Sequence, residues 1–277
     1  MSMNSVNTNL SSIVALQSLN RTAEQLSVVQ KRISTGFRVA DSKDDGGAFA
    51  AAQAVRADVA GLTAANEQLG GTKGVLETTF AALGKVSETM VKVRETLTRL
   101  ADGGLSTEQR TQYETQYGAL RTQIQNFVSD ATYNGRTLLN TATGSGGGNI
   151  VTTRNESGSV FTLTAIDGAT NLVIAATPTT AALAQNALGS AGNFNTVEAA
   201  IGTALNTFGA DSNYIDSQIR YNKDKVDALQ GGLGALIDAD LAKESAKLQA
   251  LQIRQQLGTQ ALSIANQSPQ MLISLFR

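Results

Sequence analysis

Residues Asp240–Arg277 have the sequence DLAKESAKLQALQIRQQLGTQALSIANQSPQMLISLFR. At helical spacing this stretch carries two apolar stripes, one formed by Leu241, Leu248, Leu251 and Leu262 and the other by Ile253, Leu257, Ile264, Met271 and Leu275. A helix that only covers a core needs one stripe, so two stripes predict partners on two sides. We interpret the stretch as an interaction helix that becomes ordered with its partners. The alternative is a C-terminal core helix of a globular domain.

The composition excludes most catalytic chemistry. The chain has 277 residues, no cysteine, no histidine, and a formal net charge of -1 from 22 basic and 23 acidic residues. Disulfides, the usual zinc ligands and the Ser-His and Cys-His pairs are therefore excluded. The balanced charge gives no reason to expect a nucleic acid or an anionic membrane as partner. We expect no enzyme and no cofactor.

Two groups of carboxylates are candidates for a metal site or for a catalytic pair. Asp44 and Asp45 are adjacent, but a calcium loop needs further oxygen ligands at fixed spacing, so no metal site is predicted. The remaining candidates are interpreted as solvated charges on helices rather than as a catalytic pair. They are Glu67, Glu77, Glu88 and Glu95.

The N-terminal segment, Met1–Ile33, is predicted to be a helix. Its apolar residues recur at a mean step near the 3.5 of a coiled-coil seam. It lacks the basic and long apolar regions of a cleavable secretory signal. No apolar run in the chain approaches the ~20 residues that span a bilayer. From these rules alone the protein would be expected in the cytoplasm, unless it is exported without a cleaved signal.

Two interior stretches have the most regular stripes. Between Leu76 and Leu100 apolar residues recur at steps of four and three. Between Ile201 and Leu236 the steps alternate four and three throughout, with Ser212 and Asn222 as two polar members of the stripe. Ser106–Gln109 fits a capping box at the start of another helix, and a short connection predicts an antiparallel helix pair. Asn222 lies in the second stripe, where it either fixes the register or is an ordinary exposed residue.

The middle of the chain, Thr141–Asn193, differs in composition. Gly144–Gly148 predicts a flexible break. Ser159–Thr164 alternates apolar and polar residues, as a half-buried strand does, and Asn171–Ala175 is a second strand candidate. We expect a small β element here. The whole pattern predicts a mainly α fold, a long coiled-coil or helical-bundle rod with a small central β-hairpin element and with the N- and C-terminal helices paired.

Both ends of the chain resemble bacterial flagellins. The resemblance lies in Ser18–Thr22, Arg32–Val39, Lys43–Asp45 and Gly61–Thr63 near the N-terminus and in Gln267–Arg277 at the C-terminus. It covers residues 1–140 and 196–277. Because the middle is short, the chain is similar to a compact flagellin that lacks the large variable outer domains.

The resemblance implies a division of the chain into five parts. Residues 1–35 and 246–277 are expected to be the two halves of the filament-core coiled coil, 36–47 and 233–245 the spoke linkers, and 48–232 a rod-shaped helical core domain with the β element at about 141–193. The implied function is that of a structural subunit that self-assembles into the helical bacterial flagellar filament used for swimming. The alternatives are the flagellin-like hook–filament junction protein and a non-flagellar secreted coiled-coil effector.

The resemblance also implies partners. The chain would leave the cell through the flagellar type III export apparatus with an export chaperone, and would form an extracellular filament beside hook-associated junction and cap proteins. The expected assembly interface comprises Leu10, Ile13, Leu16, Leu19, Leu26, Val29, Ile33, Leu248, Leu251, Leu257, Leu262, Ile264, Met271, Leu272 and Leu275.

A vertebrate Toll-like receptor senses many flagellins through their core domain. Arg94 and Glu95 keep the pattern of sensed members. Lys92, Thr96 and Gln116 depart from it, which predicts weak or absent sensing.

Overall fold

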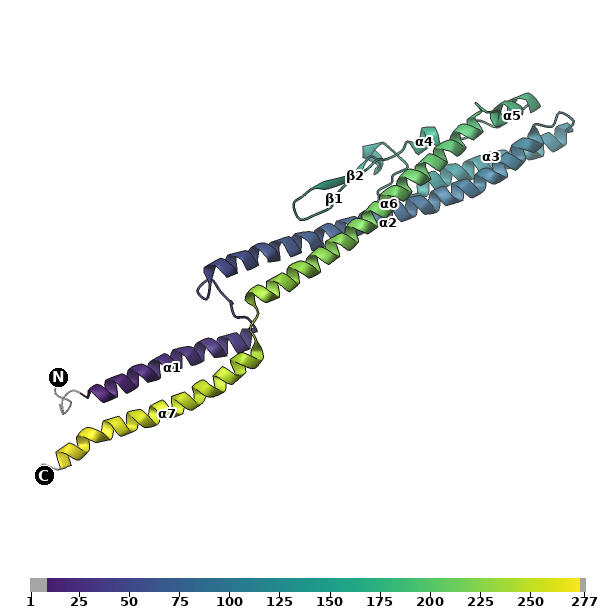
Figure 1. Ribbon diagram of the computed structural model, residues 1–277. Helices are drawn as coiled ribbons and strands as arrows, with labels where there is room; N and C mark the ends of the chain where they lie inside the picture. Colours follow the sequence, from purple (N-terminus) through teal and green to yellow (C-terminus); the bar gives the residue numbers. More distant parts are fainter. Residues whose placement is uncertain (1–8, 275–277) are drawn as a thin grey trace. The chain divides into compact units, whose positions relative to one another are not determined.

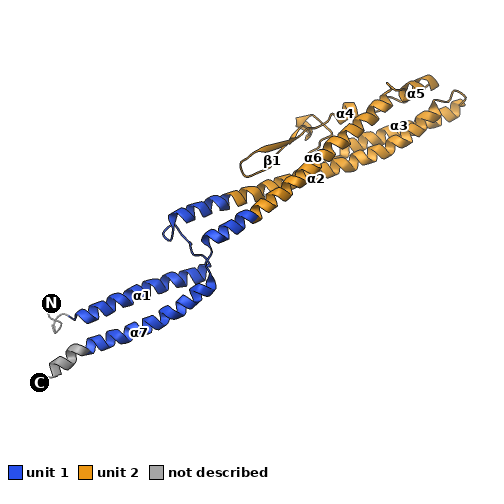
Figure 2. Ribbon diagram, viewed as in Figure 1, with its two compact units in different colours: residues 1–57, 228–277 blue, residues 58–227 orange. Residues whose placement is uncertain are grey.

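The structure is a computed structural model that describes residues 9–274, with side chains up to residue 267. The chain forms two compact units (Figure 2). Unit 1 comprises residues 1–57 and 228–277, and unit 2 comprises residues 58–227. The long helices α2 (Gly46–Leu100) and α6 (Asn193–Ile237) each contribute residues to both units. The fold is mainly helical, as the sequence predicts.

In unit 1, α1 (Leu10–Thr35) and α7 (Leu241–Ser274) lie side by side and antiparallel (Figure 1). At one end of the pair the Asn9 side chain donates a hydrogen bond to the carbonyl oxygen of Ala265 over 2.7 Å. At the other end Arg32 lies 3.6 Å from the Glu244 carboxylate. The predicted pairing of the terminal helices is confirmed.

A left-handed residue ends α1. Gly36 has φ 76°, and its N–H donates to the carbonyl oxygen of Arg32. Glycine suits this position because a Cβ would strain the left-handed backbone. The chain then pairs briefly with the end of α6, where Arg38 N–H donates to Ile237 O over 2.7 Å. Beside this contact Val39, Ala52 and Ile237 form a small buried apolar cluster.

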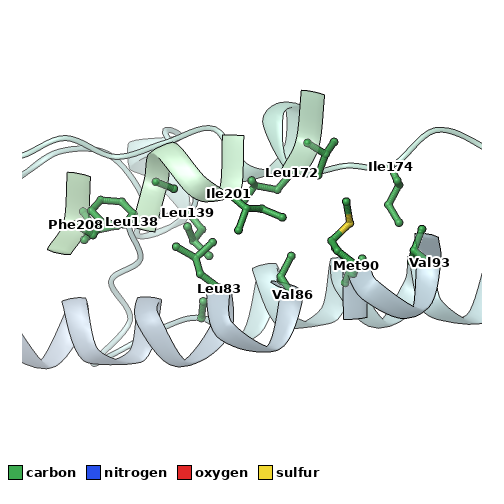
Figure 3. Packing of buried hydrophobic residues seen from close by; sticks show 14 of the residues in the cluster. Leu83, Val86, Met90, Val93, Leu138, Leu139, Leu172, Ile174, Ile201 and Phe208 are labelled. Atoms are coloured by element: carbon green, nitrogen blue, oxygen red, sulfur yellow. The ribbon is translucent and has the colours of Figure 1, made fainter. Parts of the chain in front are cut away.

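The core of unit 2 lies between α2, α3 (Thr107–Asp130) and α6. Figure 3 shows how apolar side chains of α2 meet those of α6 and of the segment between the helices. The residues labelled there are Leu83, Val86, Met90, Val93, Leu138, Leu139, Leu172, Ile174, Ile201 and Phe208. The predicted capping box is present at the start of α3, where Ser106 and Gln109 each accept from the other's backbone N–H.

A polar network replaces apolar packing at one place in unit 2. The Asn222 side chain is fully buried, and its Nδ2 donates to Asn66 Oδ1 of α2 and to the carbonyl oxygen of Arg154, both over 2.9 Å. Its Oδ1 accepts from Gln218 Nε2. Asn222 is therefore not an ordinary exposed residue. It joins α6 to α2 and to the turn after β1, and so restricts their relative register.

The β element is a two-stranded antiparallel hairpin of β1 (Ile150–Thr153) and β2 (Val160–Leu163), with Ile150 opposite Leu163. Ile150 and Leu163 are buried in the core of unit 2, whereas Val151 and Val160 are exposed. The strand predicted at Ser159–Thr164 is confirmed.

The second predicted strand, Asn171–Ala175, is wrong. Its first residue ends the short helix α4 (Gly168–Asn171), which Asp167 caps. Leu172 and Ile174 are buried, which explains the period-two pattern. The backbone is satisfied by side chains instead of a neighbouring strand: Tyr117 Oη donates to Ala175 O and Arg121 Nε to Ile174 O, each over 3.1 Å.

The predicted flexible break at Gly144–Gly148 is also wrong. A 3₁₀ turn, η1 (Thr143–Ser145), begins there, and Gly147 and Gly148 are buried. A Cβ on Gly147 would lie 2.3 Å from the carbonyl oxygen of Asn140, so the loop needs a glycine for this close approach. A further helix that the sequence analysis missed, α5 (Ala181–Leu188), follows with Thr180 as its cap.

Candidate assembly surface

The two apolar stripes of α7 have different surroundings. In the first stripe Leu251 is 7% exposed against α1, and Leu248 and Leu262 are half-buried. In the second stripe Leu257 is 63% and Ile264 60% exposed. One stripe is therefore covered within the chain and the other is open. Ile253 belongs to the open stripe, and so does Leu241 by its exposure, although the sequence pattern puts Leu241 in the covered one.

The apolar residues of α1 divide in the same way. Val29 is buried, and Leu19, Leu26 and Ile33 are half-buried. The predicted interface residues nearer its N-terminus are exposed. They are Leu10, Ile13 and Leu16.

Three predicted interface residues lie outside the described side chains. Only the helical backbone is described at Met271 and Leu272, and Leu275 lies outside the described residues.

Two exposed apolar residues of α1 were missed. Val14 and Val28 are 58% and 43% exposed. Each is adjacent in sequence to a residue of the predicted seam, Ile13 or Val29. A second apolar residue one position off a helical stripe widens the apolar face, and this signal could have found both.

Close backbone approach and polar contacts stabilise the distal part of the helix pair, which is the part that contains the start of α1 and the end of α7. A Cβ on Gly258 would lie 3.2 Å from Leu19 Cδ1, so the two helices are tightly packed there. Ser12 Oγ donates to Asn266 Oδ1 over 2.8 Å, close to the contact between Asn9 and Ala265. Since few apolar side chains are fully buried between α1 and α7, the pair has only a thin core of its own.

Charged side chains are confined to the proximal part of the pair, which contains the end of α1 and the start of α7. No Asp, Glu, Lys or Arg occurs in residues 1–20 or 255–276. Burying the open face of this distal part removes no charge from water, which keeps the desolvation cost of an interface low. Among the described side chains, the exposed surface there consists of apolar and neutral Ser, Thr, Asn and Gln side chains.

Ion pairs occupy the proximal part. Glu244 is 6% exposed, and a hydrogen bond from Lys247 together with Arg32 lowers the pKa of its carboxyl group. The Nζ of Lys31, in the last turns of α1, lies 2.8 Å from Asp41 and 2.9 Å from Asp44 in the loop that follows, and it lowers the pKa of both carboxyl groups. The Asp44 carboxylate therefore forms an ion pair with the Lys31 ammonium group.

The described residues contain no cluster of three or more His, Cys, Asp or Glu that could hold a metal ion. Within the same residues no helix is long and apolar enough to cross a bilayer. The four carboxylates of α2 considered above are all exposed.

The residues compared with the receptor contacts of sensed flagellins lie in unit 2. Lys92, Arg94, Glu95 and Gln116 are exposed. Thr96 is 2% exposed, and its hydroxyl donates to the carbonyl oxygen of Lys92 over 2.9 Å.

Arg94 is engaged within the chain. It forms an ion pair with Glu198 of α6, and its guanidinium lies 4.9 Å from the centre of the Phe194 ring.

Comparison with known proteins identifies both ends of the chain. Residues 6–143 match the bacterial flagellin N-terminal helical region, and residues 194–276 match the bacterial flagellin C-terminal helical region. Flagellin FljM of Caulobacter vibrioides is 36% identical over 100% of both chains. A flagellin of Brucella melitensis is 36% identical over 99% of this chain and 100% of its own. The crystal structure of Bacillus cereus flagellin covers 66% of this chain and 94% of its own at 20% identity, with a TM-score of 0.34.

Proposed function

We propose that the open apolar faces of α1 and α7 make the contacts that hold the subunits of a filament together. This proposal starts from the family: the chain belongs to the bacterial flagellins and is a structural, non-enzymatic subunit of the extracellular flagellar filament. The open stripe of α7 carries this proposal, because Ile253, Leu257 and Ile264 are each more than half exposed along one helix. The junction-protein and secreted-effector alternatives lose their support, since the full-length relatives are flagellins.

The energetics favour assembly only at a growing polymer. Ordering a residue costs about 1–2 kcal/mol in backbone entropy, and α1 and α7 bury few side chains between them. Fully burying a Leu or Ile side chain contributes about 1.5–3 kcal/mol. Several neighbours must therefore cover the open faces before the ordered state is favoured. Contacts between different faces of successive subunits give an open helical polymer when the rotation between subunits does not close into a ring.

We further propose that the parts of the chain divide this work. Residues 1–35 and 246–277 would form the inner filament layer, 36–47 and 233–245 the spoke, and 48–232 the rod-shaped core domain. The non-helical bend Asp238–Asp240 and the loop after Gly36, which lie side by side, support the spoke assignment. Limited proteolysis of the monomer should cut within 1–35 and 246–277 first and leave residues 48–232 intact.

Seeded growth tests the assembly surface. Short filament seeds are added to purified chain carrying Leu257→Asp, which places a charge on the open stripe. We expect growth to fall to background, while Leu257→Met, which keeps an apolar side chain, still elongates. Circular dichroism should show equal thermal unfolding of both variants, because Leu257 is 63% exposed in the single chain. Normal filaments from Leu257→Asp would exclude this stripe from the interface.

The proposed partners include the hook-associated junction and cap proteins, the flagellar export apparatus and an export chaperone. A cysteine-free chain whose terminal helices have a thin core of their own suits passage through a narrow channel in an unfolded form. Cells that lack the export apparatus should retain the chain, and cells that have it should release it into the medium.

We also propose that Toll-like receptor sensing is weak. Lys92, Thr96 and Gln116 depart from the pattern of sensed members, and the Thr96 side chain is also buried. A reporter assay should respond less to this chain than to a sensed flagellin. Replacing Lys92, Thr96 and Gln116 together with Arg, Leu and Glu should raise the response, and a strong response to the unchanged chain would contradict the proposal.

A further inference from the structure

A groove of about 570 Å³ runs between the proximal halves of α1 and α7, within unit 1. Its lining includes the apolar side chains of Val28, Val29, Ala250 and Leu251. Val28 is 43% exposed, whereas Val29 and Leu251 are buried beneath it. The groove is therefore a partly filled apolar depression that could take one more apolar side chain.

The rim of the groove is mainly cationic. Arg32, Lys247 and Arg254 line it, with Glu24 as the one acidic residue. Lys247 and Arg32 share the buried carboxylate of Glu244. Among the side chains that the structure describes, Arg254 lies within ion-pairing distance of no carboxylate. An occupant of the groove must supply an acidic group for Arg254, or it will bury this charge at a high cost.

The acidic residues of unit 1 narrow the choice of occupant. Asp41 and Asp44 are held by Lys31, and Asp45 accepts from the N–H groups at the start of α2. Glu24 lines the groove itself, and Glu244 is held by Lys247 and Arg32. Asp238 and Asp240 remain, and both are exposed, although one oxygen of Asp240 accepts from the Lys243 N–H at the start of α7.

These two carboxylates directly precede an exposed apolar side chain. Leu241 directly follows Asp240 and is 49% exposed. The segment Asp238–Leu241 thus carries the charge and the apolar group that the groove lacks.

The segment cannot fill the groove of its own chain. Leu241 opens α7, the helix that forms one wall of the groove, and Ala250 lies nine residues further along the same helix. At 1.5 Å per residue the two positions are about 13 Å apart. We infer that Asp238–Leu241 of a second copy occupies this groove, with Leu241 on the apolar lining and an aspartate beside Arg254.

This contact rests on the proposed function and specifies one interface within the filament. It is heterologous, because groove and segment are different surfaces of the same chain, so every copy can both offer and accept it. The charge-free apolar residues of α1, such as Leu10 and Ile13, are a poorer fit. They would cover Arg254 without pairing it.

Disulfide trapping tests the contact in a background without cysteine. The double variant Leu241→Cys with Ala250→Cys is grown from seeds and oxidised. A disulfide needs Cα atoms within about 7 Å, so positions 241 and 250 of one helix cannot bridge. We expect a ladder of covalent dimers, trimers and longer species on a denaturing gel. The single variants cannot form a ladder, because each has one thiol per chain.

The control pair is Tyr221→Cys with Ala250→Cys. Tyr221 is 60% exposed, and Asp224 lies about one turn away on α6. These two residues also combine an exposed apolar group with a carboxylate, so they are the alternative occupant of the groove. A ladder from the control pair but not from the Leu241 pair would overturn the inference. Filaments of normal length without any ladder would also overturn it and leave the proposed function intact. Failure of the unmodified chain to polymerise would overturn both.

Charge reversal gives a second, independent readout. Arg254→Asp should raise the monomer concentration needed for growth about tenfold or more, since it sets two acidic groups against each other. Adding Asp238→Arg to the same chain should restore most of the loss. Because Arg254 and Asp238 are both exposed, neither change should alter thermal unfolding of the monomer. No rescue by the double variant with Asp238→Arg or with Asp240→Arg would contradict the inferred pairing.

Discussion

Both compact units carry apolar helical stripes, but they differ in what covers these stripes. In unit 2 the stripes of α2, α3 and α6 face one another, and Leu83, Leu97 and Phe208 are almost completely buried. In the α1–α7 pair Val29 and Leu251 are the only apolar side chains buried among residues 9–35 and 241–267. The same sequence pattern therefore builds a complete core in one unit and an incomplete one in the other, because a two-helix pair can cover only one face of each helix.

Truncating one large apolar side chain in each unit tests this difference in core packing most directly. Phe208→Ala in unit 2 should lower the free energy of unfolding by about 3–5 kcal/mol, since it removes a large side chain that is 1% exposed. Leu257→Ala in unit 1 should change it by less than about 0.5 kcal/mol. Denaturant unfolding followed by circular dichroism measures both. Similar losses would mean that α7 has a core of its own in the monomer.

A smaller effect is expected at the buried polar network of unit 2. Asn222→Ala leaves the carbonyl oxygen of Arg154 and the Asn66 side chain with fewer partners, so stability should fall by about 1–3 kcal/mol. Asn213→Ala, at an exposed asparagine of the same helix, is the matched control and should have almost no effect. Equal unfolding midpoints for the two variants would show that the network does not stabilise unit 2.

The smallest effect concerns acid. A hydrogen bond from Lys225 lowers the pKa of the Glu156 carboxyl group, which lies in the turn of the hairpin. A lowered pKa in the folded state stabilises the fold above the unfolded pKa, and this contribution is lost as the pH falls through the folded pKa. Melting temperature should therefore decline on acidification, and Lys225→Met should weaken that dependence by an amount worth at most about 1 kcal/mol.

The same acid titration separates the units. Asp41 and Asp44 in unit 1 also have lowered pKa values, through Lys31. Lys31→Met should leave the pH dependence of unit 2 unfolding unchanged. A change there as large as that from Lys225→Met would show that the two units unfold together.

Much of the fold follows from local patterns. Steps of three and four place α1, α2, α3, α6 and α7 because a helix repeats its faces within the same few residues that define it. The Ser106 capping box was predictable for the same reason. The presence of two stripes on α7 likewise predicted that one of them would need a partner beyond α1.

The sequence by itself determined the long helices, because a helical stripe is defined by residues close together in the chain. It also carries the family likeness, in motifs near its two ends. Only the tertiary structure decided the conformation of the middle segment, residues 141–193, and the groove between α1 and α7. Leu172 and Ile174 alternate as a strand does and are buried in the core. Among the described residues their segment pairs with no strand, because Tyr117 and Arg121 of α3 donate hydrogen bonds to the carbonyl oxygens of Ala175 and Ile174. The groove beside Arg254 exists only where α1 and α7 meet, more than 200 residues apart in sequence, and no local pattern records which face of each helix the other will cover.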